Sequence, residues 1–239
     1  MKLDILAFGA HPDDVELACS GTLILHARSG LKTGIVDLTK GELGTRGTDA
    51  IRLKEAAEAS KVLGLAVREN LGLIDGFIQN DSLSRMKVVR AIRKYQPEII
   101  LCNAVTDRHP DHGHAAKLVS DSIFLAGLVK VVTTEESNIS QKPWKTKFVY
   151  HYIQDNYIKP DFVLDVSSVW DERMKAIMCY SSQFFNPDSG EPETAISTKS
   201  FIEFLAARAR EFGRQGRIEY AEGFTTERIP VVKSLSDLL

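Results

Sequence analysis

The sequence predicts an α/β domain built on a Rossmann-like, mostly parallel β-sheet with helices on both faces. Strand-like apolar runs alternate with helical patterns from residue 3 to about residue 180, which is the order of a doubly wound sheet with right-handed crossovers. Several early strand-like runs are continuously apolar, as expected for strands that helices cover on both faces. At 239 residues the chain is within reach of one large domain, so we expect residues 1–239 to form a single domain.

The expected elements follow one another along the chain with short connections. Strands are expected at Leu3–Phe8, Gly34–Leu38, Glu69–Leu73, Ile99–Asn103, Phe148–Ile153 and Phe162–Val166. Helices are expected at Val15–Arg28, Ala50–Leu63, Ser84–Tyr95, Gly113–Leu128 and Val169–Tyr180. The regular core ends near residue 185, and the less regular part, 186–239, contains an expected helix at Ser200–Phe212 and a strand-like tail at Arg228–Val232.

Three polar loops that contain glycine or proline interrupt this pattern. Residues 41–47 (GELGTRG) follow the second expected strand. Residues 133–147 and 186–198 are long enough to be lids or oligomer contacts, although ordinary surface connections explain them equally well. Ligands of open α/β sheets bind at the carboxyl ends of the strands. We therefore expect a site where loop 41–47 meets the segments that follow the first and fourth expected strands.

Composition excludes several classes of function. The chain is 44% hydrophobic and 26% charged, which is typical of a folded globular protein and excludes disorder. A net charge of −2 and a pI near 6.3 give no electrostatic reason to expect nucleic acid or an anionic membrane as a partner. The first residues lack the plan of a signal peptide, and no apolar run approaches the roughly 18 residues of a spanning helix, so a cytoplasmic location is expected.

Cysteine usage argues against a disulfide framework and against a cysteine zinc site. The three cysteines, Cys19, Cys102 and Cys179, are widely spaced and form no C-x-x-C pair. Cys19 and Cys102 fall on apolar faces of expected elements, where buried and inert thiols are the usual finding.

Residues 10–14 (AHPDD) lie where the first expected strand gives way to the first helix. His11 and Asp14 are three apart on the expected first helical turn, so their side chains emerge on one side. Pro12 suits that turn because it has no N–H to lose there. A helix-capping aspartate beside a surface histidine would explain one carboxylate. It would not explain Asp13 next to Asp14, whose repulsion a divalent cation relieves.

Residues 107–112 (DRHPDH) repeat this arrangement after the fourth expected strand. His109 and His112 are three apart, and Asp111 lies between them. One imidazole would complete a His-Asp-His metal set, and the other would be free to act as an electrostatic or acid–base group that a carboxylate orients. His114 is a further candidate, so spacing does not choose the ligand. The two segments together predict a hydrolytic zinc site with three protein ligands and an open position.

Other chemistries fit these residues less well. Two histidines and one carboxylate also describe the iron(II) facial triad, but Asp13 would then have no evident role. Gly9 is the only glycine at the first strand-to-helix turn, so the G-x-G-x-x-G pattern of dinucleotide sites is missing there. The sequence contains no G-x-S-x-G elbow and no Walker A pattern. Hydrolysis is the preferred interpretation because it uses every member of the two clusters.

At these residues the chain resembles the LmbE/PIG-L family of zinc-dependent N-acetylglucosamine deacetylases. The motifs at 10–14 and 109–112 match the two signatures of that family in order and spacing. The likeness is greatest to the branch that acts in bacillithiol biosynthesis, and it covers most of residues 3 to about 185. The segments that carry it are KGELGTRGT at 40–48 with Ile51 and Arg52, ENLG at 69–72, DGFIQN at 75–80 and DRHPDHG at 107–113.

The resemblance implies a role for each motif residue. His11, Asp14 and His112 would ligate Zn²⁺, and the same nitrogen and oxygen ligands also accept Fe²⁺. Asp13 would be the general base, and His109 would stabilise the oxyanion. The implied reaction is hydrolysis of an N-acetyl amide, in which zinc-bound water attacks the carbonyl while Asp13 takes its proton and later returns a proton to the leaving nitrogen.

The resemblance also implies how the substrate is held. Arg52 would bind the sugar or its acidic substituent, and Arg108 is a further candidate for substrate binding. The substrate of the bacillithiol branch is N-acetylglucosaminyl malate. We expect His109 to be protonated and braced by Asp111. Relatives in the mycothiol pathway have a tyrosine where this chain has Asp107, so assistance by a tyrosine at that position is not expected.

Two other functions remain open from the sequence. The protein would be a deacetylase or amidase of a different N-acetyl sugar or S-conjugate, or a metal- or sugar-binding module without activity. In each case the expected partner is a small-molecule sugar rather than nucleic acid or a membrane. A homo-oligomer is expected because members of the family often form closed oligomers.

Overall fold

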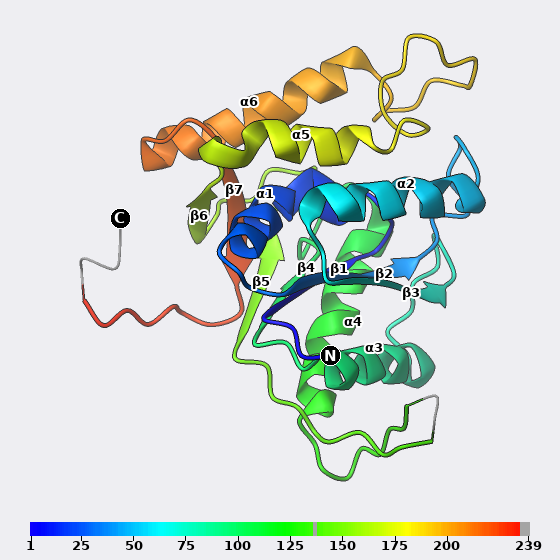
Figure 1. The fold of residues 1–239 in the computed structure, drawn as a ribbon, viewed down its shortest axis with the longest axis vertical. Helices are drawn as coiled ribbons and strands as arrows, with labels where there is room; N and C mark the ends of the chain where they lie inside the picture. Colours follow the sequence, from blue (N-terminus) through cyan, green and yellow to red (C-terminus); the bar gives the residue numbers. More distant parts are fainter. Residues whose placement is uncertain (136–137, 235–239) are drawn as a thin grey trace.

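The fold is a mostly parallel sheet with helices on both faces, as predicted. The computed structural model describes residues 1–135 and 138–234, and in this part of the chain one seven-stranded sheet has the order β3-β2-β1-β4-β5-β7-β6 (Figure 1). The strands are β1 (Ile5–Gly9), β2 (Thr33–Thr39), β3 (Val67–Leu73), β4 (Ile99–Cys102), β5 (Phe148–Tyr152), β6 (Phe162–Asp165) and β7 (Ala221–Thr226). Strands β1 to β5 pair in parallel, and β7 runs antiparallel to both β5 and β6.

The helices form layers on the two faces of this sheet. They are α1 (Asp14–Arg28), α2 (Asp49–Leu63), α3 (Ser82–Tyr95), α4 (Pro110–Ala126), the 3₁₀ turn η1 (Ser167–Val169), α5 (Trp170–Met178) and α6 (Lys199–Gly216). Helices α1 and α2 cover one face, and α3 and α4 pack together on the other (Figure 1). Helix α5 packs on the outside of α1 and α2, and α6 packs on β7 and β6 (Figure 1).

Local sequence signals set the helix ends. The Thr48 side chain accepts a hydrogen bond from the N–H of Ile51, and Asp81 accepts one from Ser84, which satisfies free donors at the starts of α2 and α3. Helix α2 ends at Gly64 in the left-handed conformation that glycine adopts without strain.

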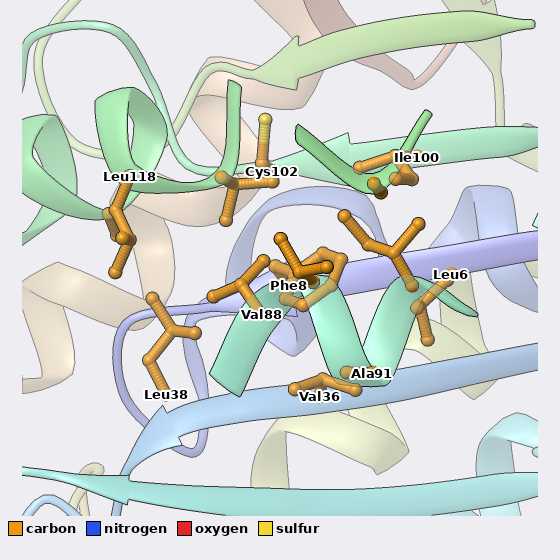
Figure 2. Packing of buried hydrophobic residues seen from close by; sticks show 14 of the residues in the cluster. Leu6, Phe8, Val36, Leu38, Val88, Ala91, Ile100, Cys102 and Leu118 are labelled. Carbon is orange, nitrogen blue, oxygen red and sulfur yellow. The ribbon is translucent and has the colours of Figure 1, made fainter. Parts of the chain in front are cut away.

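The hydrophobic core lies between the central strands and the helices. On one face of the sheet Leu6 and Phe8 of β1, Val36 of β2 and Ile100 of β4 pack against Val88 of α3 (Figure 2). All five side chains are fully buried. The continuous apolar character of these strands therefore reflects helices on both faces, as the sequence predicts.

The strand order reverses between β1 and β4. The chain passes from β1 to β2 and β3 with α1 and α2 on one face, and then α3 carries it back to β4 on the other face. The connections that follow β1 and β4 therefore lead to opposite faces of the sheet. This arrangement is a topological switch point, which is where open α/β sheets bind ligands.

The predicted strand at 228–232 is wrong. Ile229 and Val231 are 85% and 93% exposed, and the strand that completes the sheet is β7, immediately upstream. Its sequence, AEGFTT, has no apolar run, because Glu222 is a buried partner of Arg173 at 2.9 Å and Gly223 leaves room for a phenylalanine ring. Those two positions hide the strand from an analysis based on hydrophobicity.

The other expectations about organisation have mixed outcomes. Cys19 and Cys102 are buried free thiols, as predicted. Part of the expected loop 133–147, residues 136–137, lies outside the described residues. Across residues 1–135 and 138–234, none of the helices has the length and apolarity that spanning a membrane requires.

Candidate metal centre

The loops at the carboxyl ends of β1, β2, β3 and β4 line one hollow of about 310 Å³. Its lining residues are His11, Asp13, Asp14, Leu17, Leu43, Gly44, Arg52, Asp75, Gly76, Arg108, His109, His112, Gln154 and Ile196. The prediction that loop 41–47 meets the two histidine segments is therefore confirmed. A larger hollow of about 480 Å³, between β3 and α3, shares none of these residues and contains no histidine.

The AHPDD segment forms a tight turn before α1. The spacing predicts His11 and Pro12 on the first turn of the helix. The helix begins at Asp14, so both residues lie before it. The turn is closed by the N–H of His11, which donates to Asp14 Oδ2 at 2.9 Å. Asp13 has a φ of 118°, a conformation that costs a residue with a side chain about 1–3 kcal/mol. Such strain is common where a side chain must be aimed at a functional site.

His11, Asp14 and His112 come together in the hollow. His11 Nδ1 lies 3.5 Å from Asp14 Oδ2, and His112 Nε2 lies 3.2 Å from Asp14 Oδ1. Ligands about 2.1 Å from a tetrahedral Zn²⁺ are separated by roughly 3.4 Å, so these spacings fit a zinc ion. His114, which spacing left open as a ligand, is exposed and does not line the hollow. Within the described residues, the ring nitrogens of His11, His109 and His112 also lie within 4.8 Å of one another.

Neutral amides hold the Asp14 carboxylate in place. Asn103 Nδ2 donates to Oδ2 at 3.0 Å, and Gln154 Nε2 donates to Oδ1 at 2.6 Å. Burial by itself would raise the pKa of Asp14, but the neighbouring His112 and His11 hold it well below its usual range. The sequence analysis missed both amides because they come from the ends of β4 and β5 and belong to neither histidine motif.

Asp107 orients His112. Its Oδ2 lies 2.6 Å from His112 Nδ1, and the carboxylate is fixed by the backbone N–H groups of Asp155 and Asn156. This contact leaves Nε2 free to face Asp14. Asp14 and Asp107 together overcome the effect of burial and raise the pKa of His112 to about 9. A carboxylate behind a histidine ligand is the usual outer support of a metal site, and the sequence analysis had considered Asp107 only as the replacement of a tyrosine.

His11 is held in the same way by two carboxylates. Its Nε2 lies 3.0 Å from Asp75 Oδ1 and 3.3 Å from Asp111 Oδ2. Although burial lowers the pKa of His11, Asp111, Asp14 and Asp75 raise it well above its usual value. These three residues, His11, Asp75 and Asp111, are a second metal-competent group within the described residues. Their spacing is also that of hydrogen bonds from one imidazole N–H.

The prediction that Asp111 braces a protonated His109 is wrong. The Asp111 carboxylate accepts the N–H groups of Gly76 and Ile78 and points to His11. Only the backbone N–H of Asp111 meets His109, donating to Nδ1 at 3.2 Å. Burial, together with the nearby His11 and His112, lowers the pKa of His109. The lowered pKa favours the neutral imidazole, and the tautomer that fits this hydrogen bond has Nδ1 as the acceptor and the proton on Nε2.

Asp13 and Arg52 form a buried pair beside this cluster. Arg52 Nη1 lies 3.7 Å from Asp13 Oδ2 and donates to the carbonyl of Pro12, and Nη2 donates to Gln183 Oε1. Burial raises the pKa of Asp13 and the charge of Arg52 lowers it. Burial has the larger effect, and the resulting pKa is about 7. Loop 41–47 makes room for the guanidinium, because a Cβ on Gly41, which has a φ of 67°, would clash with Nη1 of Arg52.

Arg108, the other predicted substrate-binding residue, lies at the mouth of the hollow. Its side chain is half-exposed and pairs with the Asp155 carboxylate. Apart from His114, the residues proposed from the two motifs therefore line the hollow or lie directly behind it, although their individual roles remain predictions.

The fold and the cluster define an α/β protein with a metal-competent His/Asp site at its topological switch point. The sequence profile of the PIG-L family, described as GlcNAc-PI de-N-acetylase, matches residues 6–123. The conserved protein TT1542 of Thermus thermophilus has the same fold, with a TM-score of 0.86 and 35% sequence identity over 98% of both chains. This chain belongs to the PIG-L family.

Two proteins that are similar to this chain in sequence have different activities. The chain is 26% identical to the diacetylchitobiose deacetylase of Thermococcus kodakarensis, over 92% of this chain and 81% of the relative. It is 28% identical to the 4-oxalmesaconate hydratase of Pseudomonas putida, over 74% of this chain and 73% of the relative. Neither likeness points specifically to the bacillithiol branch. The choice between these reactions therefore rests on the chemistry of the site.

Proposed function

We propose that the protein is a metal-dependent hydrolase that removes the acetyl group from an N-acetylated amino sugar. The observation that carries this proposal is the position of Asp13, a buried carboxyl with a pKa of about 7, beside the His11–Asp14–His112 set in one hollow. A general base works best when its pKa is close to the operating pH. The likeness to a sugar deacetylase over most of both chains supports the choice of substrate class.

The donor set supports Zn²⁺ as the cofactor, and Fe²⁺ as an alternative. Two imidazoles and a carboxylate at spacings of 3.2–3.5 Å, each held from behind by other groups, suit either ion. When bound, the ion polarises a water molecule and the amide carbonyl.

The remaining chemistry belongs to the residues of this chain. Asp13, ionised near neutral pH, takes a proton from the attacking water, and the same carboxyl then returns a proton to the leaving nitrogen. His109 donates its Nε2–H to the oxygen that becomes negative as the carbonyl is attacked. A neutral imidazole can fill this role, because the N–H group is the hydrogen-bond donor. A protonated His109 would need a carboxylate partner, and the Asp111 carboxylate points to His11 instead.

Arg52 and Arg108 make N-acetylglucosaminyl malate one specific substrate to test. Both guanidinium groups line the hollow, and a guanidinium binds a carboxylate through two hydrogen bonds. Arg52 is buried, and its Nε has no hydrogen-bond partner within the described residues, so this donor is left for a ligand or for water.

Release of free amine tests the proposal. Protein reconstituted with Zn²⁺ or Fe²⁺ would be incubated with the methyl and malate glycosides of N-acetylglucosamine, and amine formation would be followed. We expect turnover that Asp13→Asn lowers by a factor of about 10²–10⁴. A metal-loaded protein that releases no amine from any N-acetyl glycoside, or that hydrates an unsaturated acid instead, would contradict the proposal. Equal kcat/KM for the two glycosides would contradict malate as the substrate.

A further inference from the structure

The candidate metal centre continues into a second hollow beneath α6. This second hollow also has a volume of about 310 Å³, and its lining residues are Arg108, Asp155, Ala195, Ile196, Thr198, Ser200, Phe201 and Phe204. Arg108 and Ile196 line both hollows, and a small space of about 30 Å³ that His112 and Phe204 border lies between them. The two hollows are therefore parts of one cleft that begins at the metal ligands and ends against the first turns of α6.

Apolar side chains make one wall of the second hollow. We call Ile196, Phe201 and Phe204 the aromatic shelf. The ring of Phe201 stacks on Phe184 with centroids 6.1 Å apart, and the guanidinium of Arg208 lies over Phe204 at 4.4 Å. Each ring is thus fixed by a neighbour that covers part of it, yet Phe204 is 36% exposed in the cleft. A fixed, exposed aromatic surface beside a catalytic site is typical of ligand binding.

Polar groups make the opposite edge of the shelf. Arg108 pairs with the Asp155 carboxylate, and Arg208 donates to the Asp155 carbonyl. The shelf therefore offers an apolar face with hydrogen-bonding groups at its edge. A ring with one apolar face and polar substituents at its rim matches this pattern. A small dicarboxylate matches it poorly, because its charged groups would lose water against the apolar wall.

We propose that the aromatic shelf is the subsite for the group attached to the N-acetyl sugar, and that it selects a ring with an apolar face, a second sugar or an aryl group. This inference rests on the proposed deacetylase activity and narrows its substrate class. The N-acetyl group lies at the metal ligands, and the attached ring stacks on Phe204. Asp155 and Arg108 then accept and donate hydrogen bonds at the rim of the ring.

The experiment compares kcat/KM for amine release by the metal-reconstituted enzyme. The substrates are the methyl, phenyl and malate glycosides of N-acetylglucosamine and a β-linked disaccharide of two N-acetylglucosamines. We expect a ring-bearing glycoside to exceed the methyl glycoside, and Phe204→Ala to reduce that preference about fivefold through KM, since an aromatic contact contributes about 1 kcal/mol. Phe204→Tyr keeps the ring and should keep the preference. Phe124→Ala, which removes an exposed ring on α4, is the control.

The outcomes separate the two proposals. Asp155→Asn should lower kcat/KM for the disaccharide more than for the phenyl glycoside if the ring is a sugar, and affect neither preferentially if it is aryl. A preference for the malate or methyl glycoside that Phe204→Ala leaves unchanged would overturn the subsite while leaving the deacetylase activity intact. Binding of phenyl β-glucoside that Phe204→Ala weakens, with no amine from any glycoside, would support the subsite and contradict the deacetylase.

Discussion

Replacing Asp13 by asparagine should stabilise the metal-free protein at neutral pH while removing most of its activity. The Asp13 carboxyl has a pKa of about 7 in the folded protein against an ordinary value of 3.8. Below pH 3.8 the carboxyl is protonated in both states and has no effect on stability. Above that pH the unfolded state loses the proton first, so the folded state becomes progressively less favourable until the pH passes about 7.

The magnitude follows from the same two values. At 1.36 kcal/mol per pKa unit, the rise from 3.8 to about 7 corresponds to a cost of about 4 kcal/mol at pH 8 and about 1.6 kcal/mol at pH 5. Asparagine is neutral at both pH values. The free energy of unfolding of Asp13→Asn minus that of the wild type should therefore increase by roughly 2–3 kcal/mol between pH 5 and pH 8.

Urea unfolding of the metal-free proteins at pH 5, 7 and 8 measures this difference. Asp188→Asn, at an exposed aspartate, is the matched control and should show no such trend. The same Asp13→Asn protein should retain metal and lose a factor of about 10²–10⁴ in kcat. If its stability relative to the wild type were independent of pH, Asp13 would be an ordinary ionised carboxylate and its suitability as a base would need another cause.

Three further predictions follow from the groups around the proposed metal ligands. Asp107→Ala should weaken Zn²⁺ binding about 10–100-fold because His112 loses the carboxylate that orients it; a chelator competition that finds unchanged affinity would contradict this role. The metal must displace the protons that raised pKa values hold on His112 and His11, so the apparent Zn²⁺ affinity should rise at least about tenfold from pH 7 to pH 8; equal affinities in calorimetry would refute it. Gly41→Ala should displace the guanidinium of Arg52 and raise KM with little loss of bound metal. An unchanged KM would contradict this prediction, because it would show that the loop accommodates the added methyl group without moving Arg52.

The sequence determined the parts of this protein that depend on local pattern. The strands around Leu6, Val36 and Ile100 are continuous apolar runs, and such runs predict strands that are buried on both faces. The AHPDD and HPDH segments each place their polar side chains within one turn, so their convergence follows once both are put at the carboxyl ends of neighbouring strands.

Only the tertiary structure decided which groups stand behind each functional side chain. The Asp75 and Asp111 carboxylates face His11, and Gln154 faces Asp14, across separations in sequence of up to 140 residues. No local spacing encodes such contacts, because they depend on loop paths and on the residue at which α4 begins. The motifs that indicate the site can therefore be recognised from the sequence alone. Packing between distant segments sets the lowered pKa of His109 and the raised pKa of Asp13, and it also makes a strand of the segment that contains the buried Glu222.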